Sequence, residues 1–162
     1  MSLHTGSTPY VPQAAPNECG LACLAMVAGY HGLNAGLPEL RRLCMLSAQG
    51  ATLKALIGAA ARIGLRARGF EGGPQHLEQL ALPAILHWNA VHFVVLVSVE
   101  RDLSDARRFR IHDPRAGVRT LEEAELSSRF TGAVLELTRF DSPHAALLLQ
   151  STGARSDPPP RI

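Results

Sequence analysis

The 162-residue chain has 16 Lys and Arg residues against 14 Asp and Glu, a formal net charge of +2, and a hydrophobic content of 46%. These values predict one compact domain with an ordinary core, and the alternation of basic with acidic residues argues against a nucleic-acid-binding surface. The chain has three cysteines but no CxxC pair and no HExxH motif, which predicts that it holds no metal or cofactor. The odd number of cysteines and the absence of a secretory signal predict a cytosolic protein, and no apolar stretch is long enough to span a bilayer.

The apolar periodicity predicts helices in the first third of the chain and mainly strands after it. We expect helices at 18–31, 37–45 and 52–63, strands at 65–70, 83–88, 92–99, 107–112 and 132–138, and short helices at 74–80 and 121–129. Helices followed by antiparallel strands indicate an α+β fold whose sheet packs on the first helix. The expected domain covers residues 10–140, between a flexible N-terminus at 1–9 and a linker or disordered tail at 141–162.

Cys19 opens the first predicted helix, and Gln13 lies six residues before it. No residue from Gly20 to Tyr30 is charged, so this helix is expected to be buried on all sides in the centre of the domain. The free backbone N–H groups at its start carry a partial positive charge, which lowers the pKa of a thiol placed there. Cys19 is therefore a candidate nucleophile. The alternative is a buried cysteine that only packs.

A nucleophilic cysteine needs a base and a group that orients the base, and two predicted strands supply both. His92 begins an apolar central strand, and Asp113 follows a strand whose two sides alternate in polarity. In a symmetric hairpin, His92 lies opposite Asp113 with Cβ atoms roughly 5 Å apart. The same register pairs Leu96 with Phe109, although a bulge would shift it. The alternatives are a core-edge histidine bonded to backbone and an aspartate that starts a turn before Pro114.

A series of ordered motifs around these residues resembles the double-glycine leader peptidases. These are the papain-like cysteine protease domains at the N-termini of bacterial ATP-binding cassette exporters for bacteriocins and microcins, and the chain resembles the colicin V exporter type in particular. The resemblance covers about residues 10 to 140. Its segments are Gln13, Cys19, Gly20, 22–24 (ACL), Met26, 30–32 (YHG), 40–42 (LRR), 46–53 (LSAQGATL), 85–88 (ILHW), 92–96 (HFVVL), 112–117 (HDPRAG) and 130–132 (FTG).

By this resemblance the fold is papain-like, Cys19 is the nucleophile, His92 the general base and acid, and Asp113 the group that orients His92. Gln13 and the backbone N–H of Cys19 would form the oxyanion hole. The chemistry agrees, because a side-chain amide donates to the oxyanion formed when a thiolate attacks a peptide carbonyl. Without Cys19 downstream, Gln13 would be interpreted as a solvated loop residue. Glu18 stands where many members carry Asp, a difference expected to matter little.

The remaining candidate residues carry weaker signals. Cys23 and Cys44 are expected to be buried packing residues rather than redox or metal-binding groups. His87, Trp88 and Asn89 precede the predicted central strand and are candidates for lining a substrate groove. An exposed loop histidine is an equal alternative for His87.

The resemblance implies a cysteine endopeptidase that cleaves a bacteriocin- or microcin-type precursor after a Gly-Gly motif, coupled to export by an ATP-binding cassette transporter. The expected partners are a precursor with an amphipathic leader and the transmembrane and ATP-binding domains of the exporter. The expected location is cytoplasmic, as the cytosolic domain of an inner-membrane exporter, with a free-standing peptidase as the alternative. Two other functions stay open: a leader-binding domain without catalysis, and another papain-like acyltransferase or amidase.

Overall fold

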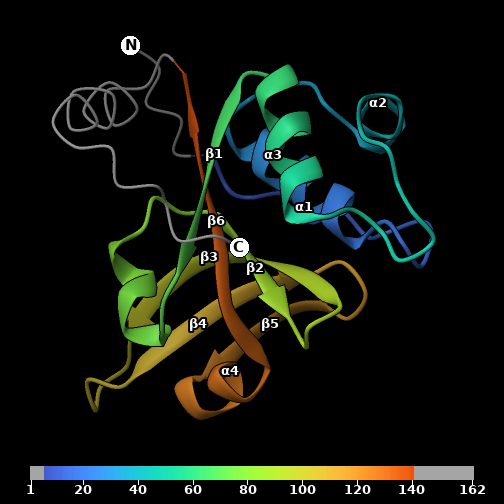
Figure 1. Cartoon of the computed structure of the whole chain (residues 1–162). Helices are drawn as coiled ribbons and strands as arrows, with labels where there is room; N and C mark the ends of the chain where they lie inside the picture. Colours follow the sequence, from blue (N-terminus) through green and yellow to red (C-terminus); the bar gives the residue numbers. More distant parts are fainter. Residues whose placement is uncertain (1–5, 141–162) are drawn as a thin grey trace, which may run out of the picture.

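The computed structural model describes residues 6–140 and has helices packed on a single antiparallel sheet (Figure 1). The helices are α1 (Cys19–Tyr30), α2 (Leu37–Leu43), α3 (Leu53–Arg62), the 3-10 helix η1 (Pro74–Gln79) and α4 (Glu123–Arg129). The strands are β1 (Leu65–Glu71), β2 (Ala84–Trp88), β3 (His92–Arg101), β4 (Arg107–Asp113), β5 (Gly117–Glu122) and β6 (Phe130–Arg139). Their order across the sheet is β1-β6-β2-β3-β4-β5, and every neighbouring pair is antiparallel.

One face of the sheet packs against α1 and α3, and α2 packs against these two helices. Ten consecutive residues of α1, from Cys19 to Ala28, are buried. They share a core with residues such as Ile85 of β2, Phe93 of β3 and Leu135 of β6. The uncharged helix is thus buried from all sides, as its composition predicts.

The opposite face of the sheet is covered by η1 and α4, which lie away from the other helices in Figure 1. Leu77 of η1 and Leu126 of α4 join a second core that includes Trp88, Phe109 and Leu121. Strands β2 and β3 therefore lie between two apolar layers. This placement explains why the segment from His92 to Leu96 is buried without alternation.

The observed hairpin of β3 and β4 corrects the symmetric register expected from the sequence. Leu96 lies opposite Ile111 rather than Phe109, and a bulge separates Leu96 from Ser98. Continuing that register places Asp113 beside Val94, diagonal to His92 rather than opposite it. Because the offset is two residues, it keeps Asp113 on the expected face of the sheet. The bulge accommodates one extra residue in β3, a local feature that alternation of side chains does not reveal.

Two further elements differ from the expectation. The strand β5 was not predicted, because its six residues, GVRTLE, do not alternate regularly in polarity and merge into the acidic run that predicts a helix at 121–129. That helix begins at Glu123, after β5 has paired with β4. The segment expected as a short helix at 74–80 is a 3-10 helix that begins with Pro74.

The N-terminal segment crosses the edge of the sheet near the end of β4. His112 Nδ1 donates to the carbonyl oxygen of Pro9 at 3.3 Å, and the Tyr10 hydroxyl donates to the carbonyl oxygen of Asp113 at 2.9 Å. These residues bring the segment that follows, including Gln13, to the turn after Asp113. Residues 1–5 and 141–162, which belong to the expected flexible start and tail, lie outside the described residues.

A stability test follows from the packing of α3. Leu56 is 1% exposed in the core under α1, whereas its neighbour Ile57 is 36% exposed. Leu56→Ala should lower the free energy of unfolding by about 2–5 kcal/mol, because it leaves a cavity in the core. Ile57→Ala is the matched control and should cost less than about 1 kcal/mol. Chemical denaturation followed by circular dichroism measures both, and equal losses would contradict this packing.

Candidate active site

Cys19 is the first residue of α1 and lies between that helix and the start of β3. Its side chain is buried, with 6% exposure. Its N-cap neighbour Glu18 makes no side-chain cap bond, so the first-turn N–H groups keep their positive potential. The local sequence therefore delivers a thiol to a position that favours its ionised form.

His92 and Asp113 form a buried pair beside Cys19. His92 Nε2 donates to Asp113 Oδ1 at 2.8 Å, and the two side chains are 7% and 10% exposed. The other ring nitrogen, Nδ1, is buried and makes no hydrogen bond. The same Oδ1 accepts the backbone N–H groups of Arg115 at 2.9 Å and Ala116 at 3.3 Å. Asp113 is thus fixed by its own turn, and in turn it fixes the ring of His92 so that Nδ1 is left for the thiol.

The pKa shifts of Cys19, His92 and Asp113 match a thiolate–imidazolium pair beside an ionised carboxylate. Burial disfavours the Cys19 thiolate, but His92 and the backbone N–H groups of Phe93 and Gly20 favour it more, so the pKa of Cys19 is lowered. Burial opposes the charge of His92 as well, yet Asp113 and Cys19 raise the pKa of His92 to about 9. The pKa of Asp113 is lowered despite its burial, chiefly because it accepts the hydrogen bond from His92.

The thiols of Cys23 and Cys44 have raised pKa values, unlike that of Cys19. Burial raises the pKa of Cys23 well above its ordinary value, with smaller contributions from Cys19 and Asp113, and burial alone raises the pKa of Cys44. Neither forms a disulfide. Of the three cysteines, only Cys19 is placed to act as a nucleophile near neutral pH.

Gln13 lies on the loop before α1, within reach of the turn that carries Asp113. Its backbone N–H donates to the carbonyl oxygen of Pro114 at 3.1 Å, and its side-chain Nε2 donates to the carbonyl oxygen of Ala15 at 3.0 Å. An amide nitrogen has two hydrogens, so one N–H of Gln13 stays available for a ligand. Together with the N–H of Cys19, it is a candidate donor to an oxyanion.

Two hollows flank these residues. The first, of about 250 Å³, is lined by Gln49, Ala51, Thr52, Leu53, His87, Ala90, Val91 and Phe93. The second is lined by Gln13, Ala14, Ala15, Pro16 and Arg115. Cys19 lines neither hollow, but the first includes Phe93, whose backbone N–H faces Cys19, and the second includes Gln13 of the loop before α1.

The three expected groove residues have different surroundings. His87 lines the first hollow, and its Nδ1 lies 2.9 Å from the Thr131 hydroxyl. Asn89 is exposed in the turn between β2 and β3, where its φ is 49°. Trp88 is 2% exposed and packs in the core beneath η1 and α4. Of these three residues, His87 is therefore the one whose side chain borders the hollow.

Glu18 and Arg41 form an ion pair near the site that was not predicted from the sequence. Glu18 is 4% exposed although it is a carboxylate, and Arg41 of α2 pairs with both of its oxygens. Arg41 lies 23 positions along the chain, so its spacing gives no sign of the contact. The one signal available was the position of an acidic residue directly before the nucleophile.

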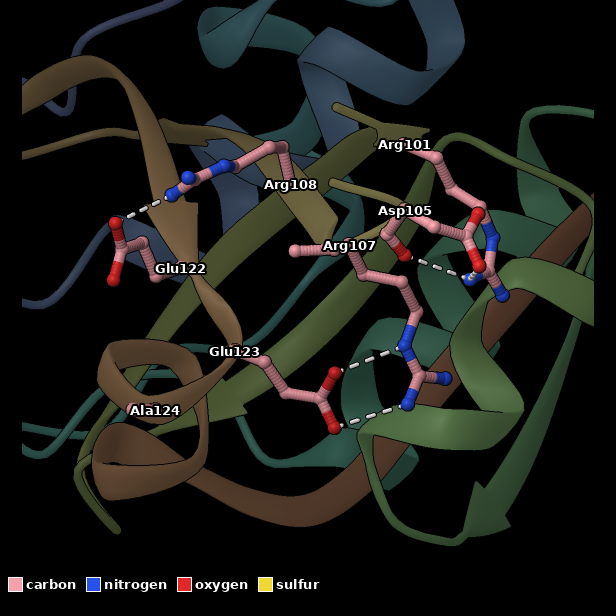
Figure 2. A pocket seen from close by; sticks show the side chains of 8 residues that line it. Arg101, Asp105, Arg107, Arg108, Glu122, Glu123 and Ala124 are labelled. Carbon is pink, nitrogen blue, oxygen red and sulfur yellow. Dashed lines mark hydrogen bonds and ion pairs between the residues drawn. The ribbon is translucent and has the colours of Figure 1, made fainter. Parts of the chain in front are cut away.

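Arginines of the β3–β4 hairpin line a separate hollow, shown in Figure 2. Each faces a carboxylate of the same chain: Arg107 with Glu123 at 2.9 Å, Arg108 with Glu122 at 2.6 Å and Arg101 with Asp105 at 3.2 Å. Arg107 thereby links the hairpin to the start of α4, and Arg108 links it to the end of β5. Their charge is compensated inside the chain, so the hollow presents little net attraction to an anion.

Within residues 6–140, no group of three or more His, Cys, Asp and Glu side chains is arranged to hold a metal ion. The same part of the chain contains no helix with the length and apolarity that crossing a membrane requires.

Comparison with known sequences relates this geometry to a family. Residues 7–142 match the model of the Peptidase C39 family. The "Colicin V secretion/processing ATP-binding protein CvaB" of Escherichia coli is 45% identical over 129 residues, which are 80% of this chain and 18% of that protein. An uncharacterized protein of Methanothermobacter thermautotrophicus is 32% identical over 139 residues, which are 86% of this chain and 94% of that protein. The chain thus spans less than a fifth of the length of the colicin V relative.

Solved structures show the same fold. A double-glycine-motif protease from an AMS/PCAT transporter, in complex with its leader peptide, aligns with a TM-score of 0.75 and 32% identity over 83% of this chain and 95% of that chain. The peptidase domain of Streptococcus ComA, a bifunctional ABC transporter, aligns with a TM-score of 0.72 and 26% identity over 82% and 98%. These matches confirm the predicted papain-like α+β fold and the predicted family. The chain therefore belongs to the Peptidase C39 family, which consists of cysteine peptidases.

Proposed function

We propose that this chain is the cysteine endopeptidase that removes the leader of a bacteriocin- or microcin-type precursor after a Gly-Gly pair. The observation that carries the proposal is the state of His92. One ring nitrogen is bonded to buried Asp113, and the other is left for Cys19, the one cysteine whose pKa is lowered. This is the arrangement that a thiol needs to attack a peptide carbonyl.

The reaction follows from these contacts. The Cys19 thiolate attacks the carbonyl carbon, and the oxyanion accepts hydrogen bonds from the free N–H of Gln13 and the backbone N–H of Cys19. The His92 imidazolium then donates a proton to the leaving amine, which frees the cargo and leaves a thioester on Cys19. Neutral His92 next takes a proton from water, whose attack releases the leader. Throughout, Asp113 stabilises the charge and orientation of His92.

Two other functions weigh less. A domain that only bound leaders would not need a lowered thiol pKa beside an oriented histidine. A papain-like acyltransferase or amidase would share these three residues but not the substrate. The relatives that match over most of this chain include secretion/processing proteins, and a neighbouring structure contains a leader peptide, which favours the peptidase.

The proposed partners are the precursor and the transmembrane and ATP-binding domains of an exporter. The support is that the colicin V relative is named as a secretion/processing ATP-binding protein and is several times longer than this chain. In that setting the peptidase would work on the cytoplasmic side of an inner membrane, where leader removal is coupled to export.

The two hollows suggest how the Gly-Gly pair is read. We assign the leader to the hollow bordered by His87, Val91 and Phe93, and the cargo to the hollow bordered by Gln13 and Arg115. The leader-side hollow is the smaller, at about 250 Å³ against about 400 Å³. Glycines at the two positions before the cut would let the backbone approach Cys19 closely, because they have no Cβ.

The nucleophile can be tested by alkylation and cleavage. Cys19→Ala should abolish cleavage and keep the fold, whereas Cys23→Ala and Cys44→Ala should keep activity. Because the pKa of Cys19 is lowered and those of the other thiols are raised, iodoacetamide should modify Cys19 first at neutral pH. Faster labelling of Cys23 or Cys44 would contradict the assignment.

The pH dependence of cleavage tests the role of His92. The cleavage rate should decline as the pH rises through about 9, where His92 loses the proton that it gives to the leaving amine.

The role of Asp113 can be separated from that of an ordinary turn residue. Asp113→Asn should lower kcat by about a hundredfold or more, because the amide no longer stabilises the imidazolium. Asp105→Asn, a change in an exposed hairpin loop, is the control and should leave kcat unaltered. Activity that survives in His92→Ala but not in His112→Ala would show that the wrong histidine was assigned.

The substrate proposal is tested with precursors altered around the cut. Replacing either glycine of the pair with Leu should stop cleavage, because the added side chain keeps the carbonyl away from Cys19. Substitutions in the cargo beyond the first residues should change the rate little. Mass spectrometry of the digested precursors distinguishes these outcomes, and efficient cleavage after a Leu-containing pair would refute the specificity while leaving the peptidase assignment intact.

A further inference from the structure

We infer that the ion pair of Glu18 with Arg41 positions the oxyanion loop, defined as residues 13–18, so that both side chains are positioning residues for the peptidase reaction. The inference rests on the proposed function and adds two residues to it. Neither side chain touches the reacting atoms. Both are proposed to act on Gln13 through the backbone of the loop.

The carboxylate of Glu18 is held from two directions. Arg41 donates to it through both Nε and Nη2, which makes a two-pronged contact. Glu18 Oε2 also accepts the backbone N–H of Ala15 at 3.1 Å. In the reverse direction, the backbone N–H of Glu18 donates to the carbonyl oxygen of Ala15 at 3.1 Å. Two reciprocal hydrogen bonds therefore close the loop between residues 15 and 18.

Ala15 connects this closure to the oxyanion donor. Its carbonyl oxygen, which accepts the N–H of Glu18, also accepts Gln13 Nε2 at 3.0 Å. The Ala15 residue thus lies between the Glu18 carboxylate on one side and the Gln13 amide on the other. Any shift of the Glu18 side chain moves Ala15 and, with it, the direction of the remaining N–H of Gln13.

Arg41 is what makes a buried carboxylate tolerable at this position. The Glu18 side chain is 5% exposed, and the hydrogen bond from Arg41 is the main reason that its pKa is lowered. Without Arg41, an unpaired buried carboxylate would either take up a proton or turn toward water. Both changes weaken the bond to Ala15. The ion pair therefore ties helix α2 to the loop that carries the oxyanion donor.

The ionisation of Cys19 has other causes. The groups that shift the pKa of Cys19 are His92 and the backbone at Phe93 and Gly20, and Glu18 is not among them. Loss of the ion pair should therefore damage stabilisation of the oxyanion without changing thiolate formation. This separation gives the inference a readout that a purely structural role would not share.

The test compares Arg41→Gln and Glu18→Gln with Arg42→Gln, a control on the same helix whose side chain is 75% exposed and pairs with Glu39. With a Gly-Gly precursor, each of the first two variants should lower kcat about ten- to hundredfold and leave KM within about twofold, as expected for a misplaced donor that acts in the transition state. Affinity for a peptide aldehyde ending in Gly-Gly should fall by a similar factor. Alkylation of Cys19 by iodoacetamide should stay within about twofold of the original chain, because that reaction forms no oxyanion.

Two additional variants guard against loss of folding. Arg41→Lys keeps the charge but loses the two-pronged contact, so it should recover part of kcat. The Glu18→Gln/Arg41→Gln double variant should be no slower than either single variant, because the two act as one unit. Unchanged kcat and aldehyde affinity, or a parallel loss of alkylation and kcat, would overturn the inference. If the original chain cleaved no Gly-Gly precursor, the proposed function would fail. The aldehyde and alkylation measurements would still decide the role of the ion pair.

Discussion

The burial of the uncharged helix α1 against the centre of the sheet is the interaction on which the rest of the structure depends. A helix that is apolar on all sides has no preferred face, so amphipathicity does not fix its rotation. Shape does so instead: a Cβ on Gly20 would lie 3.1 Å from Leu56, and one on Gly29 would lie 2.6 Å from Pro9. Close approach at both ends of the helix sets its rotation and thereby directs Cys19 toward the start of β3.

The order of the elements could be predicted from the sequence because it is written in local patterns. The apolar run after Cys19 and the β-branched segment from His92 each have a composition that suits one structure. Beside the loop, Arg101 pairs with Arg107, which is three residues away from the expected register, and the bulge between Leu96 and Ser98 reduces the difference to two at the open end; neither feature has such a signature. His92 and Asp113 still meet, because an even offset preserves the face and their side chains span a diagonal pair. Strand β5 was missed because its pairing with β4, not its own pattern, defines it.

The candidate site likewise contains some residues that could be predicted from the sequence and others that could not. Cys19, His92 and Asp113 could be proposed from residue type and spacing, because each begins or ends an element that the sequence marks clearly. The roles of Glu18 and Arg41 could not, because their contact joins two helices through side chains 23 positions apart. Likewise, no pattern before the first helix predicts that this segment returns to the turn after β4. Contacts of this kind depend on the tertiary arrangement, which short sequence patterns do not specify.

The polar contacts of the site lie at the seam between the helical layer and the sheet. Cys19 comes from α1 and His92 from β3, while Gln13 bonds to Pro114 in the turn that follows β4. Separating the layers would take the Cys19 thiolate away from the His92 imidazolium and expose the apolar core between α1 and the sheet to water, which is unfavourable. The same burial that strengthens their electrostatic interactions therefore also resists opening of the seam. Because a rigid seam holds the donors in place before substrate arrives, the free energy of leader binding can be used to bring the scissile carbonyl to Cys19 rather than to assemble the site.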